Sequence, residues 1–280
     1  MRQLLAILAV AAMPWLARGH GDVHEQIAAV SVEIERNPRD AALHFKRAEL
    51  HRVHRDWKLA LADLNRASQL DPRLPNLEFC RGRLLFDANQ FAEAKVTLDR
   101  ELRVHPEHVE ALLLRARAEA SLNLRAAAIE DFSRAIALAR EPQPDWFIER
   151  ARLRATLGDD GIARALDGLD DGIKRLGRLV ALQQTAIELE LARRNFDGAL
   201  ARLDEITARS ARKESWLAQR GDILVRAGRT GEAREAFAAA LAAIETLPPA
   251  HRGTSAVTDL EKRIREQLSG LATSVARARN

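Results

Sequence analysis

Histidines gather near the start of the sequence. Five of the eight lie between positions 20 and 54, at His20, His24, His44, His51 and His54. Imidazole nitrogens are common metal ligands, and the nearby carboxylates of Asp22 and Glu25 could add oxygen ligands. His51 and His54 are three residues apart, a helical spacing at which two side chains can reach one ion. The cluster is therefore a candidate metal site.

Other features of this cluster favour ordinary structural roles. It contains no cysteine and no CxxC spacing of the kind that selects a metal. Asp22 and Glu25 also fit a helix start, where each carboxylate can accept a hydrogen bond from a free backbone amide. We expect packing and surface histidines, with an exported metal-binding protein that uses the N-terminal histidines as the alternative function. We expect no cofactor.

Motifs for catalysis and nucleic-acid binding are missing from the sequence. It has no G-x-S-x-G, no glycine-rich phosphate loop, no HExxH and no carboxylate pair with a supporting histidine and serine. The net charge is +4, and basic and acidic residues alternate without a long run of one sign. Cys80 is the only cysteine, and we expect it to be a small buried residue. We predict neither an enzyme nor a nucleic-acid-binding protein.

Residues 1–19 have the pattern of a secretory signal. Arg2 precedes the apolar segment Leu4–Met13, and Pro14 then interrupts the helix. Ala17 and Gly19 are small residues at the positions that a signal peptidase reads, so we expect cleavage after Gly19. No segment reaches the roughly 18 apolar residues that a membrane-spanning helix needs. We therefore expect an exported protein, periplasmic or extracellular, without a transmembrane segment after cleavage.

A repeat of 34 residues organises the sequence. Prolines keep this spacing at Pro38, Pro72 and Pro106. Alanines keep it at Ala60, Ala94 and Ala128. Apolar residues within each period recur at helical spacing, which predicts two amphipathic helices, a tight turn, and a proline that ends the second helix. One such hairpin cannot bury its apolar face alone, so the hairpins must stack on one another.

In this pattern the chain resembles the tetratricopeptide repeat (TPR) family. The shared features are a small residue in the first helix, an aromatic after the turn, alanines in the second helix and a closing Asp-Pro. The first unit carries Ala48, Trp57, Ala60, Ala67 and Pro72, and the second carries Gly82, Phe91, Ala94, Leu98 and Pro106. The third carries Ala116, Ala128, Phe132 and Ala135, and the last clear unit Gly221, Ala233, Phe237 and Ala240. The resemblance implies an all-α, right-handed superhelical TPR α-solenoid of stacked antiparallel helix pairs with a C-terminal capping helix.

The repeat and the resemblance together predict the layout of the chain. After the signal, residues 20–40 form a half repeat. Full units follow at 41–74, 75–108, 109–143 and 214–247, with degenerate units at 144–179 and 180–213. Residues 254–280 form the capping helix.

The resemblance also implies where two sets of arginines lie. The seventh position of the units holds Arg47, Arg81, Arg115, Arg150 and Arg220. Family geometry implies ion pairs within a unit, such as Arg47 with Asp63 and Arg115 with Asp131. Two positions later, facing the family's concave groove, stand Arg83, Arg117 and Arg152, with Glu49, Glu188 and Asp222 in the same column of the end units.

Apolar residues accompany the second set of arginines in the implied groove. They are Phe45, Phe79, Phe86, Leu113 and Ile148. The combination of apolar surface and bidentate donors suits an extended or helical segment of a partner protein that carries an acidic group. The resemblance therefore implies a non-enzymatic scaffold or adaptor for protein–protein interaction.

Overall fold

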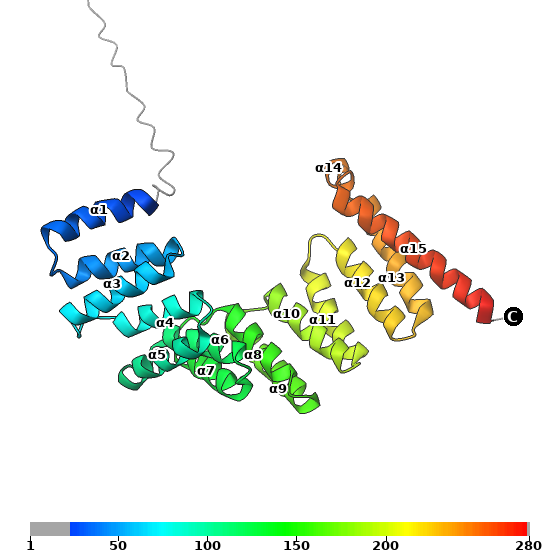
Figure 1. Cartoon of the computed structure of the whole chain (residues 1–280). Coiled ribbons are helices and arrows are strands. Elements are labelled where there is room, and N and C mark those ends of the chain that lie inside the picture. Colours follow the sequence, from blue (N-terminus) through cyan, green and yellow to red (C-terminus); the bar gives the residue numbers. More distant parts are fainter. Residues whose placement is uncertain (1–22, 279–280) are drawn as a thin grey trace, which may run out of the picture. The chain divides into compact units, whose positions relative to one another are not determined.

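The computed structural model describes residues 23–278, which form fifteen helices and no strand (Figure 1). The signal sequence, His20 and Asp22 lie outside these residues. The helices group into two compact units, the first ending at Leu122 and the second beginning at Asn123. This boundary falls inside the expected unit 109–143, and each compact unit is described by itself below.

Unit 1 consists of six helices in which each packs against the next along the chain. They are α1 (Val23–Arg36), α2 (Ala41–Val53), α3 (Trp57–Leu70), α4 (Leu77–Asp87), α5 (Phe91–Val104) and α6 (Val109–Ser121). The pairs α2–α3 and α4–α5 are hairpins, and the first helices of successive hairpins also touch, α2 against α4 and α4 against α6. One side of unit 1 is therefore built from α2, α4 and α6.

Unit 2 is also built from packed helix pairs. It contains α7 (Arg125–Leu138), α8 (Pro144–Ala155), α9 (Asp159–Leu176), α10 (Val180–Ala192), α11 (Phe196–Arg209), α12 (Glu214–Arg226), α13 (Thr230–Glu245), α14 (Pro249–Arg252) and α15 (Ser255–Ala278). The hairpins are α8–α9, α10–α11 and α12–α13. The predicted all-α fold of stacked helix pairs is confirmed.

Small residues allow the two helices of a hairpin to approach closely. Ala48 on α2 and Ala60 on α3 are at most 1% exposed. At Gly221 on α12, an added Cβ would lie 2.5 Å from the ring of Phe237 on α13. The small residue predicted in mid first helix is thus needed because the partner helix leaves no room for a side chain.

The turn inside each hairpin uses a left-handed residue. Positive φ angles occur at Arg55, Asn89, Asn123, Arg194 and Gly228, and at Gly158 between α8 and α9. Asparagine and glycine adopt this conformation readily, whereas arginine does so at a cost. The first three positions keep the spacing of 34 residues, so the repeat specifies backbone conformation as well as side chains.

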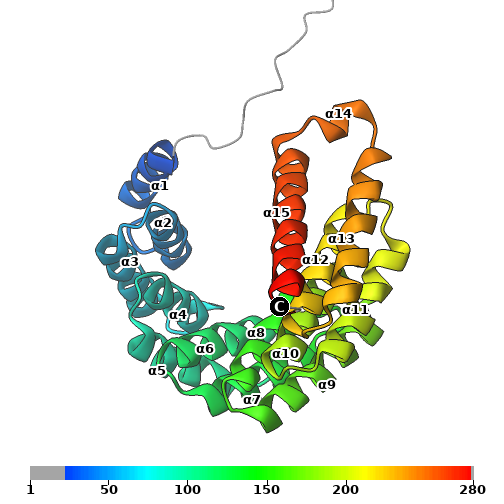
Figure 2. The same ribbon diagram turned by 90° about the vertical axis from the view of Figure 1, so that its right-hand side faces the viewer.

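The C-terminal helix α15 covers the end of unit 2 as predicted. It runs beside α13 (Figure 2) and contacts it. Ile264 is fully buried and Val257 is 3% exposed, in the same core as Phe237. Arg263 of α15 also binds Asp222 of α12 at 2.7 Å. This helix shields an apolar surface that the last hairpin would otherwise expose.

Among the helices of residues 23–278, none combines the length and the apolar character needed to cross a membrane.

Candidate functional site

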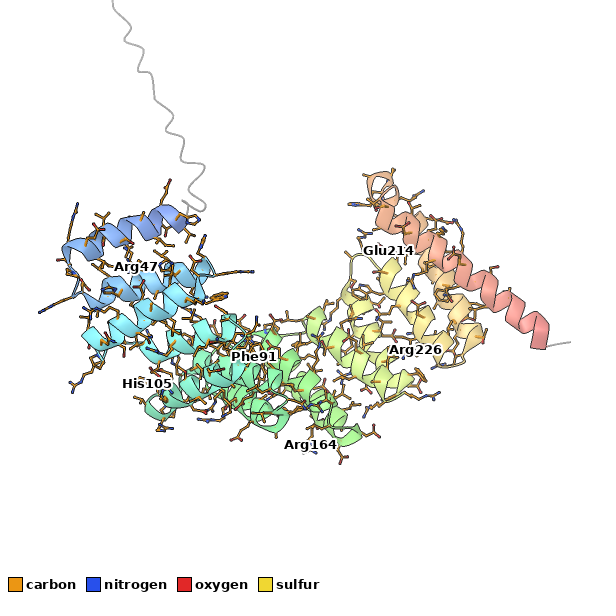
Figure 3. All side chains as sticks on the ribbon, in the orientation of Figure 1. Arg47, Phe91, His105, Arg164, Glu214 and Arg226 are labelled. Atoms are coloured by element: carbon orange, nitrogen blue, oxygen red, sulfur yellow. The ribbon has the colours of Figure 1, made fainter. Side chains whose placement is uncertain are left out.

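The side of unit 1 formed by α2, α4 and α6 carries the three aromatic residues of the predicted groove. We call it the α2–α4–α6 face. Phe45 on α2 and Phe79 and Phe86 on α4 are half-buried. The Phe79 ring lies 4.7 Å from the His108 ring, and the Phe86 ring lies 5.3 Å from that of Phe91 (labelled in Figure 3). Phe79 and Phe86 are thus each packed against a second aromatic ring, while part of their surface stays exposed.

Two predicted groove residues differ from expectation. Leu113 is 5% exposed and Ile148 is 9% exposed, so both belong mainly to the core. Ile148 packs with Phe147 and other buried residues of unit 2. These two side chains offer little surface to a partner.

Arg83 is ion-paired within unit 1. Its guanidinium binds the carboxylate of Glu49 on α2 and lies 5.6 Å from the centre of the Phe79 ring. Arg52 also binds Glu49, at 3.2 Å, and reaches Asp87 at 2.5 Å. The four charged residues form an alternating network across α2 and α4 that carries no net charge.

The other two arginines of that predicted set lie on separate units. Arg117 is partly exposed on α6 of unit 1. Arg152 is exposed on α8 of unit 2. A continuous ladder of the three arginines therefore stays a prediction.

The pairing of Arg83 with Glu49 was not predicted, although a signal was present. The two residues are 34 positions apart, which places them at the same position of successive hairpins. Neighbouring hairpins stack with their first helices in contact, so equal positions with opposite charges can meet. A comparison of charges at equal positions of successive hairpins would have found the pair.

The seventh-position arginines join hairpins to one another. The predicted ion pair of Arg47 with Asp63 is confirmed, with Nε and Nη2 at 2.7 and 2.8 Å from the carboxylate. Arg47 (labelled in Figure 3) also reaches backwards to Ser31 on α1 at 3.0 Å. The hydrogen bond to Asp63 raises the pKa of the Arg47 guanidinium, against the effect of burial.

The backward contact recurs in both units. Arg81 binds Asn65 at 2.6 Å, Arg115 binds Asp99 at 2.7 Å, and Arg220 binds Asp204. In each case the acceptor lies sixteen residues earlier, on the second helix of the preceding hairpin. The pairing of Arg115 with Asp131 stays a prediction, since these residues belong to different units.

The described histidines of the N-terminal cluster are engaged with each other and with aspartates. The Nε2 atoms of His24 and His54 are 2.9 Å apart, and His54 Nδ1 lies 2.9 Å from Asp56. His44 is buried and lies 3.2 Å from Asp63. Within residues 23–278, no group of three or more histidine, cysteine, aspartate or glutamate side chains is arranged to hold a metal ion.

Cys80 is buried and free, as predicted. Burial, with the nearby Glu49 carboxylate, raises the pKa of its thiol to about 12. A thiol with such a pKa is protonated at neutral pH and is a poor nucleophile.

Comparison with known proteins identifies the repeats. A model of the tetratricopeptide repeat-like domain matches residues 170–252, and a tetratricopeptide repeat model matches residues 81–143. The two segments together take up just over half of the chain. No curated protein sequence matches the chain.

Solved structures show the same fold at low sequence identity. A tetratricopeptide repeat protein from Parabacteroides merdae matches with a TM-score of 0.53 and 17% identity, covering 88% of this chain and 93% of that one. Pseudomonas aeruginosa pilF matches with a TM-score of 0.53 and 20% identity, covering 71% and 90%. Yeast Tom70 matches with a TM-score of 0.51 and 16% identity over 74% of this chain, which spans only 45% of Tom70.

Three observations support the same family: the stacked helix pairs, the small residues between the helices of a pair, and the two family matches. Proteins of this kind generally serve as non-enzymatic scaffolds for protein interactions. The chain belongs to the tetratricopeptide repeat family.

Proposed function

We propose that the protein is a non-enzymatic scaffold that binds a segment of a partner protein on the α2–α4–α6 face. The observation that carries the proposal is the composition of this face. The half-open rings of Phe45, Phe79 and Phe86 stand beside the charged groups of Glu49 and Arg83 on adjacent helices. Aromatic residues and arginine are enriched in protein interfaces, where a few well-packed side chains carry most of the binding energy.

The ion pair of Arg83 sets a condition on the partner. An acidic side chain of the bound segment competes with Glu49 for the guanidinium of Arg83. The Arg83 side chain is 33% exposed, so it is open on one side. A carboxylate that bonds to it exchanges one ion pair for another, and most of the affinity then comes from the rings. Arg117 on α6 and, separately, Arg152 in unit 2 are further candidate contacts.

A displayed library of random short peptides tests the proposal. Peptides selected on the full chain are expected to combine apolar residues with at least one aspartate or glutamate. They should bind Arg83→Glu at least about tenfold more weakly, because an attractive charge contact becomes repulsive.

The matched control is Arg66→Glu, which places the same charge change on an exposed residue of α3. Both variants should keep the helical circular dichroism of the parent chain. Equal loss of binding in the two variants, or no loss in Arg83→Glu, would rule out this face.

A further inference from the structure

Unit 2 contains a group of arginines that form no ion pair with its described carboxylates. Arg150 and Arg154 lie on α8, and Arg164 (labelled in Figure 3) and Arg175 lie on α9, which packs against α8. Within the described part of the chain, neither Arg150 nor Arg154 forms an ion pair with a carboxylate. Two carboxylates lie near them, Asp171 near Arg150 and Asp167 near Arg154, so the four arginines outnumber the acidic groups that act on this pair.

Arg150 is the exception among the seventh-position arginines. Arg47, Arg115 and Arg220 each bind an aspartate, and Arg81, which binds Asn65, is also ion-paired with Glu78 at 3.6 Å. Arg150 is only 8% exposed, and its one hydrogen bond is a long contact of 3.4 Å from Nη1 to the Ser133 hydroxyl. A guanidinium has five donors, and a buried cation without a counter-charge is costly. Most of the hydrogen-bonding capacity of Arg150 is thus available.

Arg150 and Arg154 converge on one point of α9. An added Cβ at Gly168 would lie 3.0 Å from Arg150 Nη2 and 3.1 Å from Arg154 Nη1. Arg154 Nη1 also donates to the carbonyl oxygen of Arg164 at 3.0 Å. The missing side chain at Gly168 lets two guanidinium groups lie side by side over the α9 backbone.

The like charges around Arg150 make this arrangement of guanidinium groups electrostatically unfavourable. Burial, followed by the like charges of Arg154 and Arg175, lowers the pKa of Arg150 to about 10. Asp171 acts in the opposite direction but forms no ion pair with it. Arg175 is itself occupied, since it donates to the carbonyl oxygens of Ile136 and Ala139 at the end of α7. A bound anion would relieve the repulsion among these groups.

We propose that Arg150 and Arg154 bind a small oxyanion of the phosphate or sulfate class between α8 and α9. Guanidinium groups bind such anions through paired N–H donors, and two groups that converge can hold one anion together. Arg150 is nearly enclosed while Arg154 is partly exposed, so the anion enters from the side of Arg154. Because Arg150 is only 8% exposed, a free ion suits the site better than a phosphate carried on a macromolecule.

Titration of the full chain with sodium phosphate tests the proposal. Thermal unfolding is followed at constant ionic strength, with sodium chloride as the reference and sodium sulfate and sodium acetate as further arms. The unfolding temperature should rise with phosphate and sulfate, saturate, and change less with chloride. A response to acetate as large as that to phosphate would assign the site to carboxylates and overturn the proposal, as would equal shifts with phosphate and chloride.

Substitutions locate the binding. Arg154→Gln should weaken phosphate binding, measured by calorimetry, at least about tenfold because one charged donor group is lost. Arg209→Gln, on an exposed arginine of α11, should leave it unchanged. Equal affinities of the parent chain and Arg154→Gln would contradict the assignment.

Gly168→Ala provides a test that keeps both arginines. Alanine favours a helix more than glycine does, so the variant should fold at least as well as the parent in phosphate-free buffer. Its methyl group would occupy the point where the guanidinium groups converge and push them apart, so phosphate affinity should fall severalfold. Unchanged phosphate affinity in this variant would also overturn the proposal.

Discussion

In a stacked repeat, whether a charged residue is neutralised depends on the residues at related positions of the neighbouring hairpins. The sequence alone suggests that Arg83 is a cation available to a partner. In the structure, Glu49 at the same position of the preceding hairpin neutralises its charge. Arg150 shows the reverse case, because the acceptor sixteen or seventeen residues earlier is Ser133 and not an aspartate. A site in this fold is therefore defined by columns of residues and not by single positions.

Cys80 should be unreactive in the folded protein. Its raised pKa of about 12 leaves almost no thiolate at neutral pH, and the side chain is buried. Iodoacetamide followed by mass spectrometry should label it only after denaturation. Labelling of the native protein at the rate of a free cysteine would show that α4 is more open than described.

Arg55 should be replaceable with a gain in stability. Its φ of 67° is left-handed, and Asn89 and Asn123 occupy the equivalent turns. Arg55→Asn should raise the free energy of unfolding by about 1 kcal/mol, because asparagine adopts this conformation at lower cost. Urea unfolding measures the change. The same substitution at Arg66, inside α3, should be neutral or destabilising, and equal effects at both sites would refute the backbone explanation.

At the scale of elements, arginine–aspartate pairs join successive hairpins. Asp99 of α5 binds Lys95 on its own helix and Arg115 on α6. Burial tends to raise the pKa of Asp99, but the hydrogen bonds from Lys95 and Arg115 outweigh it and hold the pKa below the usual value. A carboxyl with a lowered pKa in the folded state stabilises it above its unfolded pKa, and this contribution disappears as the pH falls through the folded pKa.

Removal of the Arg115 guanidinium should therefore change the acid titration of Asp99. In Arg115→Gln, the pKa of Asp99 followed by NMR should move up towards the ordinary value, and acid unfolding should begin at a higher pH. Arg66→Gln changes an arginine of the same unit without touching Asp99 and should leave that pKa in place. An unmoved pKa of Asp99 in Arg115→Gln would show that this contact is not maintained in solution.

The capping helix α15 should contribute strongly to the stability of unit 2. Ile264 is fully buried in the core that contains Phe237. Ile264→Ala should lower the free energy of unfolding by about 2–5 kcal/mol, because it leaves a cavity. Glu266→Ala, two residues away and exposed, should change it by less than about 0.5 kcal/mol. Similar denaturation midpoints for the two variants would mean that α15 does not cover the core.

The helices were more predictable than the exposure of their side chains. Pro72 and Pro106 mark the ends of hairpins because proline removes a backbone donor, a local effect that sequence shows directly. Leu113 and Ile148 were placed correctly on first helices, yet their neighbours bury them. Burial depends on side chains from other helices, which a repeat position alone does not specify.

At the scale of the molecule, the division into two units had no signal in the sequence. The 34-residue period passes through residues 109–143 without a change, while α6 belongs to the first compact unit and α7 to the second. The period encodes hairpins through local contacts. The grouping of hairpins depends on how much each pair of neighbours packs, which is a sum over many side chains.

Export of the protein is a proposal that rests on residues 1–19. The charged start, the apolar segment and the small residues before His20 support it. Expression in a bacterial host with the full sequence should yield a mature chain whose N-terminus, read by mass spectrometry of the exported fraction, is His20. An intact Met1 in a protein that stays in the cytoplasm would contradict the proposal.

The central claim is that the α2–α4–α6 face binds a partner segment whose acid competes with Glu49 for Arg83. The most direct measurement is the affinity of one selected acidic peptide for the parent chain, Glu49→Gln and Arg83→Glu. Because Glu49→Gln removes the competing carboxylate, this account predicts tightest binding there, weaker binding to the parent and weakest binding to Arg83→Glu. Weaker or unchanged binding to Glu49→Gln would contradict it.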